Sequence, residues 1–228
     1  MTQWVETPSG GRDRGPAGLL RAWAEVMVRP RRFFRNGVAP GDQAPGLVFA
    51  VAVTLAHVTV RFLLDPAQVP VIAGRPTASL GFALLVAALI AAPLALHLTA
   101  ALQTVLLVVL SAVGVVGERA GVSQTVQAVA YATAPCALSG APVPVLQSLA
   151  AGYGFVLLVV GIGTVHDLSW PRALVATVLP GVLVFGYGFR GFAAAAQMAD
   201  GRLLWAVSNE TNATGAALVD LTLAVQLV

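Results

Sequence analysis

The chain has 228 residues, of which 57% are hydrophobic and only 10% are charged, whereas about 25% of the residues in a soluble domain are charged. A chain of this length still has mostly surface to cover, so long apolar segments solvated by lipid account for the shortfall better than a large core does. The composition therefore excludes an ordinary soluble domain and indicates an integral membrane protein, and the net charge of +3 does not point to nucleic-acid binding.

The N-terminal part divides into a tail and an amphipathic segment. Residues 1–16 are polar and rich in glycine, which predicts a disordered tail. Within residues 17–36, five apolar residues recur at helical spacing, namely Leu19, Leu20, Trp23, Val26 and Met27. An amphipathic helix of this kind is expected to lie in the plane of the lipid headgroups.

A basic segment follows this helix and completes the same region. Pro30 is expected to end the helix, so that four arginines meet lipid phosphates while a phenylalanine pair enters the interface. These predicted membrane-surface residues are Arg29, Arg31, Arg32, Phe33, Phe34 and Arg35. Basic residues beside a first span also mark the cytoplasmic side in general, and this simpler interpretation is preferred to specific recognition of a lipid or protein.

Residues 37–196 form the predicted membrane domain, an all-α polytopic bundle of about five transmembrane helices. The expected spans are residues 46–64, 78–114, 124–143, 145–165 and 172–196. The second span is about twice as long as the ~30 Å hydrocarbon layer requires. It contains either two helices or one helix kinked at Pro93, and the absence of Gly and Pro from residues 97–99 favours one helix.

The C-terminal segment, residues 197–228, is predicted to lie outside the bilayer. Apolar and polar residues alternate with period two from Val219 to Leu227, which predicts one strand of a small β-hairpin. Asn209 and Asn212 each begin an Asn-X-Thr sequon and are candidate glycosylation sites.

The distribution of arginine predicts the orientation in the membrane. Most of the arginines precede the first span or lie in the loops around Arg119 and Arg172. Because positive charge accumulates on the cytoplasmic side, we expect a cytoplasmic N-terminus in the cell membrane. Five spans then place the C-terminus outside.

Polar residues inside the spans form the candidate functional site. Thr54, His57, Arg61 and Asp65 fall on one face of the first span. Arg61 is near the end of the apolar run and is expected to reach toward the interface and pair with Asp65, whereas a polar conduit or ligand site is the alternative. Polar residues of the long span are expected to hydrogen-bond neighbouring helices, although a transport path has the same pattern. The candidate intramembrane polar site comprises His57, Arg61, His97 and Gln103.

Motifs for catalysis or cofactor binding are absent from the sequence. It contains no nucleophile elbow, no P-loop and no paired carboxylates within a span. The three histidines lie on different segments without the spacing of metal ligands, and Cys136 is near none of them in the sequence. We therefore expect a protein that is not an enzyme and holds neither a cofactor nor a metal.

Three short patterns occur in order along the chain. A proline precedes a phenylalanine pair before the first span, a tyrosine is followed by a proline in the third, and a Gly, His, Ser, Arg series occupies the turn between the last two. Their residues, besides the phenylalanine pair, are Pro30, Tyr131, Pro135, Gly161, His166, Ser169 and Arg172. Together with five spans, this order resembles the Yip family of membrane proteins, in its prokaryotic branch, over about residues 23–192.

The resemblance implies a five-span helical bundle with a cytosolic N-terminus, and the family is named for eukaryotic relatives that interact with Ypt/Rab GTPases. The leading hypothesis is a non-enzymatic Yip-type membrane protein that organises the membrane or binds a membrane or cytosolic protein partner. Its other expected contacts are the lipid bilayer and anionic headgroups. The alternative is a small-solute transporter or permease component, which a continuous polar cavity would favour. The sequence does not indicate an oligomeric state.

Overall fold

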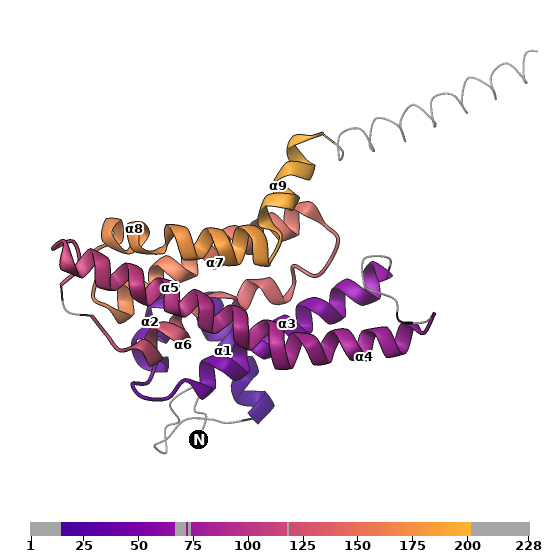
Figure 1. The fold of residues 1–228 in the computed structure, drawn as a ribbon, viewed down its shortest axis with the longest axis horizontal. Helices are drawn as coiled ribbons and strands as arrows, with labels where there is room; N and C mark the ends of the chain where they lie inside the picture. The colour runs from indigo at the N-terminus through magenta and orange to yellow at the C-terminus, as the bar shows by residue number, and fades with distance from the viewer. Residues whose placement is uncertain (1–14, 67–71, 73, 118, 202–228) are drawn as a thin grey trace, which may run out of the picture.

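The computed structural model describes residues 15–66, 72, 74–117 and 119–201, and all regular structure in this part of the chain is helical. The elements in chain order are α1 (Gly15–Val28), α2 (Pro30–Gly37), α3 (Ala44–Leu64), α4 (Pro76–Val86), η2 (Ala87–Ala91), α5 (Ala92–Ala112), α6 (Val122–Ala132), η3 (Ala134–Ala137), α7 (Pro144–Val165), α8 (Trp170–Gly181), η4 (Val182–Gly188) and α9 (Gly191–Ala199). α8 packs against both α5 and α7 (Figure 1). The predicted all-α membrane fold is confirmed.

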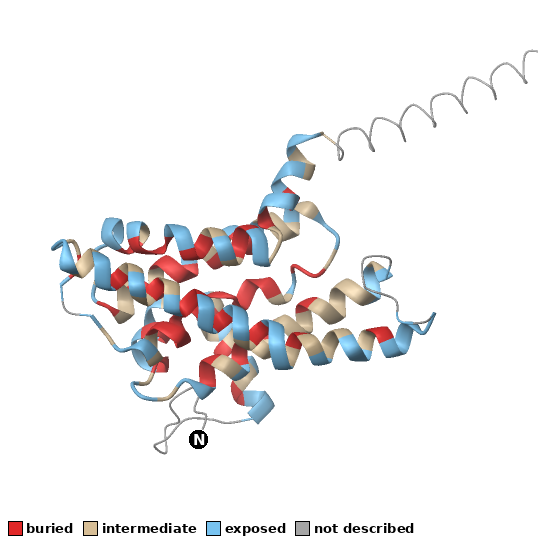
Figure 2. Cartoon of the chain, viewed as in Figure 1, coloured by how far each residue is buried: buried red, intermediate tan, exposed pale blue. Residues whose placement is uncertain are grey.

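Four helices of the described chain are long and apolar enough to cross a bilayer: Ala44–Leu64, Pro76–Ala112, Pro144–Val165 and Trp170–Gly188. The first three coincide with predicted spans to within two residues, and the fourth covers the first part of the predicted span 172–196. Much of the outer surface of α4 and α5 is exposed (Figure 2). Large apolar side chains such as Leu89, which is 72% exposed, stand on this surface. An exposed apolar surface on helices of this length is suited to contact with lipid.

The second predicted span is one helix of 37 residues, Pro76–Ala112, without a turn near His97. Its irregularity is the π-helical segment η2, which ends two residues before Pro93. Proline lacks a backbone N–H, and its ring crowds the carbonyl four residues earlier, here that of Leu89. A wider turn at that position relieves the crowding while the helix continues.

The third predicted span, residues 124–143, is not confirmed as a membrane-spanning helix. α6 has 11 residues, or about 16 Å, which is half the hydrocarbon thickness. It ends where Pro135 introduces the 3-10 segment η3, and the chain beyond continues without a regular helix. All residues from 125 to 136 are buried. Non-helical backbone is tolerated at membrane depth when protein encloses it, so this segment is a buried broken helix in a bundle of four longer ones.

This broken helix nevertheless runs the length of α3. Near the start of α3, Gly46 lies against Gln127, and a Cβ on that glycine would come within 2.9 Å of the Gln127 Cα. Farther along α3, a Cβ on Gly140 would clash with the His57 carbonyl oxygen. The absence of a side chain at both glycines therefore lets the two segments approach closely.

The bundle has two ends, which we name by the helices found there. At the α2 end, residues of α2 line a pocket with the turn between α7 and α8. At the α9 end, Arg61 and Asp65 of the α3 terminus line a pocket with Gly140 and residues of α7 and α9. The end of α3 and α9 therefore lie at one end of the bundle, and α2 and the turn between α7 and α8 lie at the other.

The N-terminal segment differs from the prediction of an interfacial helix followed by a basic loop. Arg29–Arg35 lies mainly in the helix α2 rather than in a loop, and Phe33 and Phe34 are each only 2% exposed. On α1, Ala22 and Val26 are fully buried against the bundle. The predicted entry of the phenylalanine pair into the lipid interface is therefore wrong. Amphipathic periodicity alone does not distinguish a face that meets lipid from one that meets protein.

Two further predictions lie largely outside the described residues. Of the predicted tail, residues 1–14 are outside, whereas Gly15 and Pro16 begin α1. The predicted C-terminal β-hairpin, with Asn209 and Asn212, is outside as well, because the described chain ends at Gly201.

Candidate functional site

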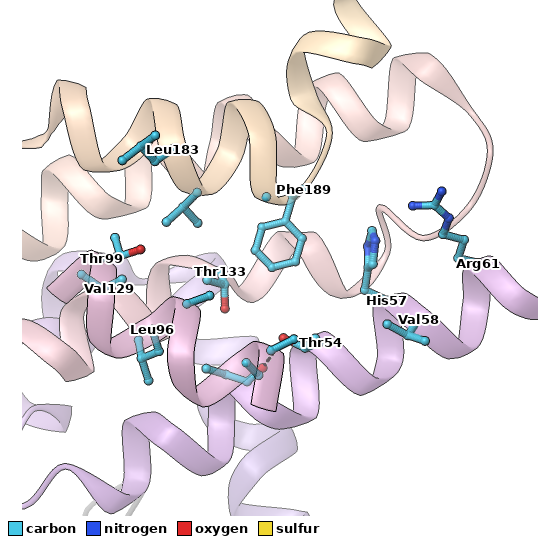
Figure 3. A pocket seen from close by; sticks show the side chains of 16 residues that line it. Thr54, His57, Val58, Arg61, Leu96, Thr99, Val129, Thr133, Leu183 and Phe189 are labelled. Carbon is cyan, nitrogen blue, oxygen red and sulfur yellow. Dashed lines mark hydrogen bonds between the residues drawn. The ribbon is translucent and has the colours of Figure 1, made fainter. Parts of the chain in front are cut away.

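A cavity of about 380 Å³ lies between α3, the η2–α5 junction, the α6–η3 segment and η4; we call it the α3 cavity. Its α3 wall includes Ala50, Thr54, His57 and Arg61 (Figure 3). These residues share one face over three helical turns. This is the face on which the sequence placed Thr54, His57 and Arg61, so the predicted candidates do line a common space.

Most hydroxyl groups in the cavity wall are used within their own segments. Thr54 donates to the Ala50 carbonyl at 2.8 Å, and Thr133 donates to the Ala130 carbonyl at 2.7 Å. Such bonds to the preceding turn satisfy the hydroxyl and leave mainly the methyl group for contact with a ligand. The remaining wall is largely apolar, and His57 and Arg61 carry most of its polarity.

His57 is held in one tautomer by the broken helix. Its Nδ1 lies 3.0 Å from Ser139 Oγ, and the Ser139 hydroxyl donates to the Cys136 carbonyl at 2.8 Å. Because the hydroxyl has one proton, the His57 Nδ1–H donates to Ser139, and Nε2 is left as an acceptor. The imidazole ring also makes a T-shaped contact with Phe189, with 5.5 Å between the ring centroids.

Arg61 joins the cavity to a small polar pocket at the α9 end. That pocket has a volume of about 40 Å³, and Asp65 and Arg190 line it together with Arg61. Arg190 has a φ of 62°, in the left-handed region, which costs about 1–2 kcal/mol for a residue with a side chain. The side chain of Arg190, whose backbone is strained, and the Asp65 carboxylate thus line the same pocket as Arg61. This placement is compatible with the expected pairing of Arg61 with Asp65.

The other two predicted members of the polar site lie elsewhere. His97 is exposed on the outside of α5, and its Nδ1 lies 2.7 Å from the Pro93 carbonyl oxygen. Gln103 is fully buried and donates to the Ala176 carbonyl of α8 at 2.9 Å, while its Oε1 has no hydrogen-bond partner among the described residues. The predicted hydrogen bond to a neighbouring helix therefore exists for Gln103, but neither residue reaches the α3 cavity.

The residues of the resemblance meet at the α2 end in an aromatic cluster. The centroid of the Tyr131 ring lies 4.8 Å from that of Phe33 and 5.0 Å from that of Phe49, and both contacts are edge to face. Phe34 packs on Gly161, where a Cβ would come within 2.9 Å of the phenyl ring. Pro30 is the first residue of α2, a position that suits proline because the first N–H has no helical partner.

His166, at the end of α7, fixes the loop before α6. Its Nδ1 accepts from the Ala120 N–H at 3.1 Å, so its Nε2–H donates to Thr125 Oγ1, also at 3.1 Å. Burial, together with the positive charge of Arg119, lowers the pKa of His166 to about 4. The side chain is therefore neutral at physiological pH.

The remaining residues of the resemblance have positions without comparable contacts. Pro135 lies in η3 and is buried. Ser169 is the N-cap of α8 but makes no side-chain capping bond, and Arg172 is exposed in the first turn of that helix. In the described part of the chain, no group of three His, Cys, Asp or Glu residues is arranged to hold a metal.

A second cavity, of about 290 Å³, lies at the α2 end, and we call it the α2 pocket. Arg31 and Arg35 line it from α2, and Asp167 and Trp170 line it from the turn between α7 and α8. The sequence predicted these arginines as members of a loop and did not reveal this pocket. Their spacing of four residues was the available signal, because it places both on one face once the segment is a helix.

Comparison with protein-family models matches residues 24–190 to the Yip1 domain. The chain belongs to the Yip1 domain family. The match contains every residue on which the predicted resemblance was based and ends close to α9. No curated protein and no solved structure matches the chain. With four apolar helices of sufficient length, this member of the family is a multi-pass integral membrane protein.

Within this Yip1 domain, the characteristic residues and the α3 cavity are separate. Phe33, Phe34, Tyr131, Gly161 and His166 hold helices together at the α2 end. None of them lines the α3 cavity. The family pattern therefore accounts for packing, and the two cavities are the candidates for binding.

Proposed function

We propose that this protein is a non-enzymatic Yip-type membrane protein that organises anionic lipid at its α2 end and presents the same end to a membrane or cytosolic protein partner. The observation that carries the proposal is the α2 pocket, in which Arg31 and Arg35 face the turn between α7 and α8. A phosphate or carboxylate headgroup suits such a pair, because guanidinium groups donate two parallel hydrogen bonds to these anions.

The packing of α2 supports a preorganised site. Phe33 and Phe34 are buried in the bundle, whereas Arg29, Arg31, Arg32 and Arg35 are all exposed. A buried aromatic pair fixes the helix, so little side-chain and backbone freedom remains to be lost when a headgroup binds.

The surroundings of the pocket also suit the membrane surface. Asp167 partly balances the two pocket arginines and leaves a net positive charge. Trp170 lines the same pocket and is 53% exposed, and tryptophan is enriched at the level of the headgroups. Positively charged segments next to a span are attracted to anionic lipid by about 1 kcal/mol per arginine.

The proposed orientation follows from these charges. The basic α2 end would face the cytoplasm, in accordance with the positive-inside rule. α9 follows η4 at the opposite end, beside Arg61 and Gly140, so the chain beyond it would begin outside the cell membrane. Five crossings, with the broken helix counted as one of them, would give this arrangement.

A small-solute transporter is the second candidate, and the α3 cavity is the observation that favours it. The cavity contains His57 and Arg61, but its α6 wall begins at Val129. The residues that line it do not include the aromatic cluster of Phe33, Phe49 and Tyr131, whose side chains are all buried. A mainly apolar cavity beside a tightly packed cluster supports the non-transporting proposal, because a transport path needs a continuous polar lining.

The decisive experiment compares two double variants of the full-length protein in nanodiscs of mixed phosphatidylcholine and phosphatidylserine. Arg31→Gln/Arg35→Gln removes both pocket cations, and Arg29→Gln/Arg32→Gln removes the same charge from exposed positions outside the pocket. Native mass spectrometry after exchange into neutral detergent measures the phosphatidylserine that is retained.

We expect the pocket variant to lose about tenfold in retained phosphatidylserine, equivalent to about 1.4 kcal/mol, and the control to lose much less. Equal losses in the two variants would show that the arginines act only as a general basic flank. Reproducible solute uptake by proteoliposomes that disappears in His57→Leu and Arg61→Gln would instead establish the transporter.

A further inference from the structure

The α3 cavity has its two ionisable side chains at one end and is largely apolar at the other. Figure 3 shows His57 and Arg61 on one side and Leu96, Val129 and Leu183 on the other, where Thr99 contributes a hydroxyl group. Along α3, the wall extends from Ala50 to Arg61, or about 16 Å at 1.5 Å per residue. A space of this length with polarity at one end is complementary to a molecule that has an apolar chain and a polar head.

Two helices are irregular where they border this cavity. The π-helical segment η2 contributes Ala91, and the π-helical segment η4 contributes Leu183, Val184 and Gly188. π-Helical turns are rare and frequently occur at functional sites. Two such segments from different parts of the chain border one cavity, which is evidence for a binding site that does not depend on its volume.

The cavity reaches the outer surface of the bundle. Ala91 and Ala95 line it and are also exposed, so small side chains leave an opening between the long helix and its neighbours. On a membrane-spanning helix, exposed apolar positions meet lipid. A ligand that is dissolved in the bilayer therefore has a lateral route into the cavity.

We infer that the α3 cavity binds one acyl chain of an anionic amphiphile, with the chain between α3 and η4 and the anionic head at Arg61 and Arg190. The volume of about 380 Å³ falls in the range of small-ligand pockets. A free fatty acid and a phospholipid that inserts one of its chains share this chemistry.

The charges at the α9 end select an anionic head. Arg61, Arg190 and Asp65 share the small polar pocket, and together they carry a net charge of +1. Two guanidinium groups and one carboxylate in the lining favour a carboxylate or phosphate over a cationic head, because guanidinium groups bind these anions well. The site is at the opposite end from the α2 pocket, so either proposal can fail without the other.

The first test uses a fatty acid with a photoreactive diazirine in its chain and the full-length protein in phosphatidylcholine nanodiscs. Ala95→Phe fills the cavity from its exposed wall, and Ala101→Phe adds the same side chain at an exposed position of α5 outside the cavity. Mass spectrometry of the digested protein locates the crosslinks, and circular dichroism confirms equal helicity of the variants.

We expect labelling of cavity-lining peptides in the parent and in Ala101→Phe, and a reduction of about tenfold in Ala95→Phe. Equal labelling of the two phenylalanine variants would mean that the probe reports ordinary boundary lipid, and the inference would be overturned.

The second test examines the head. Arg61→Gln should reduce labelling by the fatty acid but leave labelling by its uncharged methyl ester unchanged, and Arg75→Gln, which removes an exposed charge outside the cavity, should affect neither. Two outcomes would contradict an anionic head. The preference for the acid over the ester could be lost in both variants, or it could persist in Arg61→Gln. Repeating the comparison with a diazirine phospholipid distinguishes the sources, because the stronger cavity-specific labelling identifies the preferred ligand.

Discussion

The two ends of this Yip1 domain are packed in opposite ways. At the α2 end, Phe33, Phe49 and Tyr131 are buried edge to face, and Phe34 packs directly on Gly161. Farther along α3, alanines, threonines and π-helical turns surround about 380 Å³ of space. The residues that make the family recognisable therefore stabilise the fold, whereas other residues line the space available for a ligand.

Truncation of one aromatic ring at each end gives the largest contrast. Phe33→Ala should destabilise the protein by about 3–5 kcal/mol, because it leaves a hole in a tightly packed cluster. Phe189→Ala should cost less than half as much, since this ring is only partly buried and already borders a cavity. Denaturation in detergent followed by tryptophan fluorescence measures both. Similar losses would show that the two ends are equally packed, and a negligible loss for Phe33 would restore its predicted place in the lipid interface.

A methyl group added at each end sharpens the comparison. Gly161→Ala places a Cβ within 2.9 Å of the buried Phe34 ring, and overpacking of this kind costs about 1–3 kcal/mol. At Gly188, the nearest atom to an added Cβ is the Leu183 carbonyl oxygen, at 3.5 Å, so Gly188→Ala should change stability by less than about 0.5 kcal/mol. The same denaturation assay applies, and equal effects of the two substitutions would refute the contrast.

The smallest expected effect concerns the neutral His166 at the α2 end. The pKa of His166 is about 4 in the folded protein and 6.5 in the unfolded chain. Between these values the unfolded chain binds more protons, so the free energy of unfolding falls as the pH decreases through this window. Lowering the pH from 7.5 to 6.0 should remove about 1 kcal/mol.

The His166→Gln variant has no titrating group at position 166. Its loss of stability when the pH is lowered should therefore be smaller than that of the parent. Arg119→Gln removes only the smaller cause of the lowered pKa, so burial still keeps His166 neutral in the folded protein at pH 6.0 and the loss should match that of the parent. The unfolding midpoint at the two pH values measures each protein, and parallel losses in the parent and His166→Gln would exclude His166 as the source.

Local patterns in the sequence were sufficient for several features of the fold. The continuous helix Pro76–Ala112 follows from the absence of a turn near His97. The shared face of Thr54, His57 and Arg61 follows from helical periodicity within a single span. Both inferences depend on residues that are close together in the chain, where backbone geometry alone relates their positions.

The tertiary structure decided what surrounds Phe33 and the third predicted span. Nothing in the neighbourhood of Phe33 distinguishes burial against Tyr131 from insertion into lipid, since both environments are apolar. Residues 124–143 were predicted to form a span, but Pro135 interrupts the helix. The surrounding helices enclose the non-helical backbone, which lipid could not solvate.

The candidate site shows the same division. Composition and periodicity are properties of contiguous residues, so they were sufficient to predict a membrane protein with long apolar helices, a basic N-terminal segment and a polar face on α3. That His57 and Arg61 border a cavity with η4, while His97 and Gln103 lie apart from it, is evident only in the folded protein. A cavity is bounded by helices from distant parts of the chain, and packing sets their relative rotation, which the pattern of any one helix does not contain.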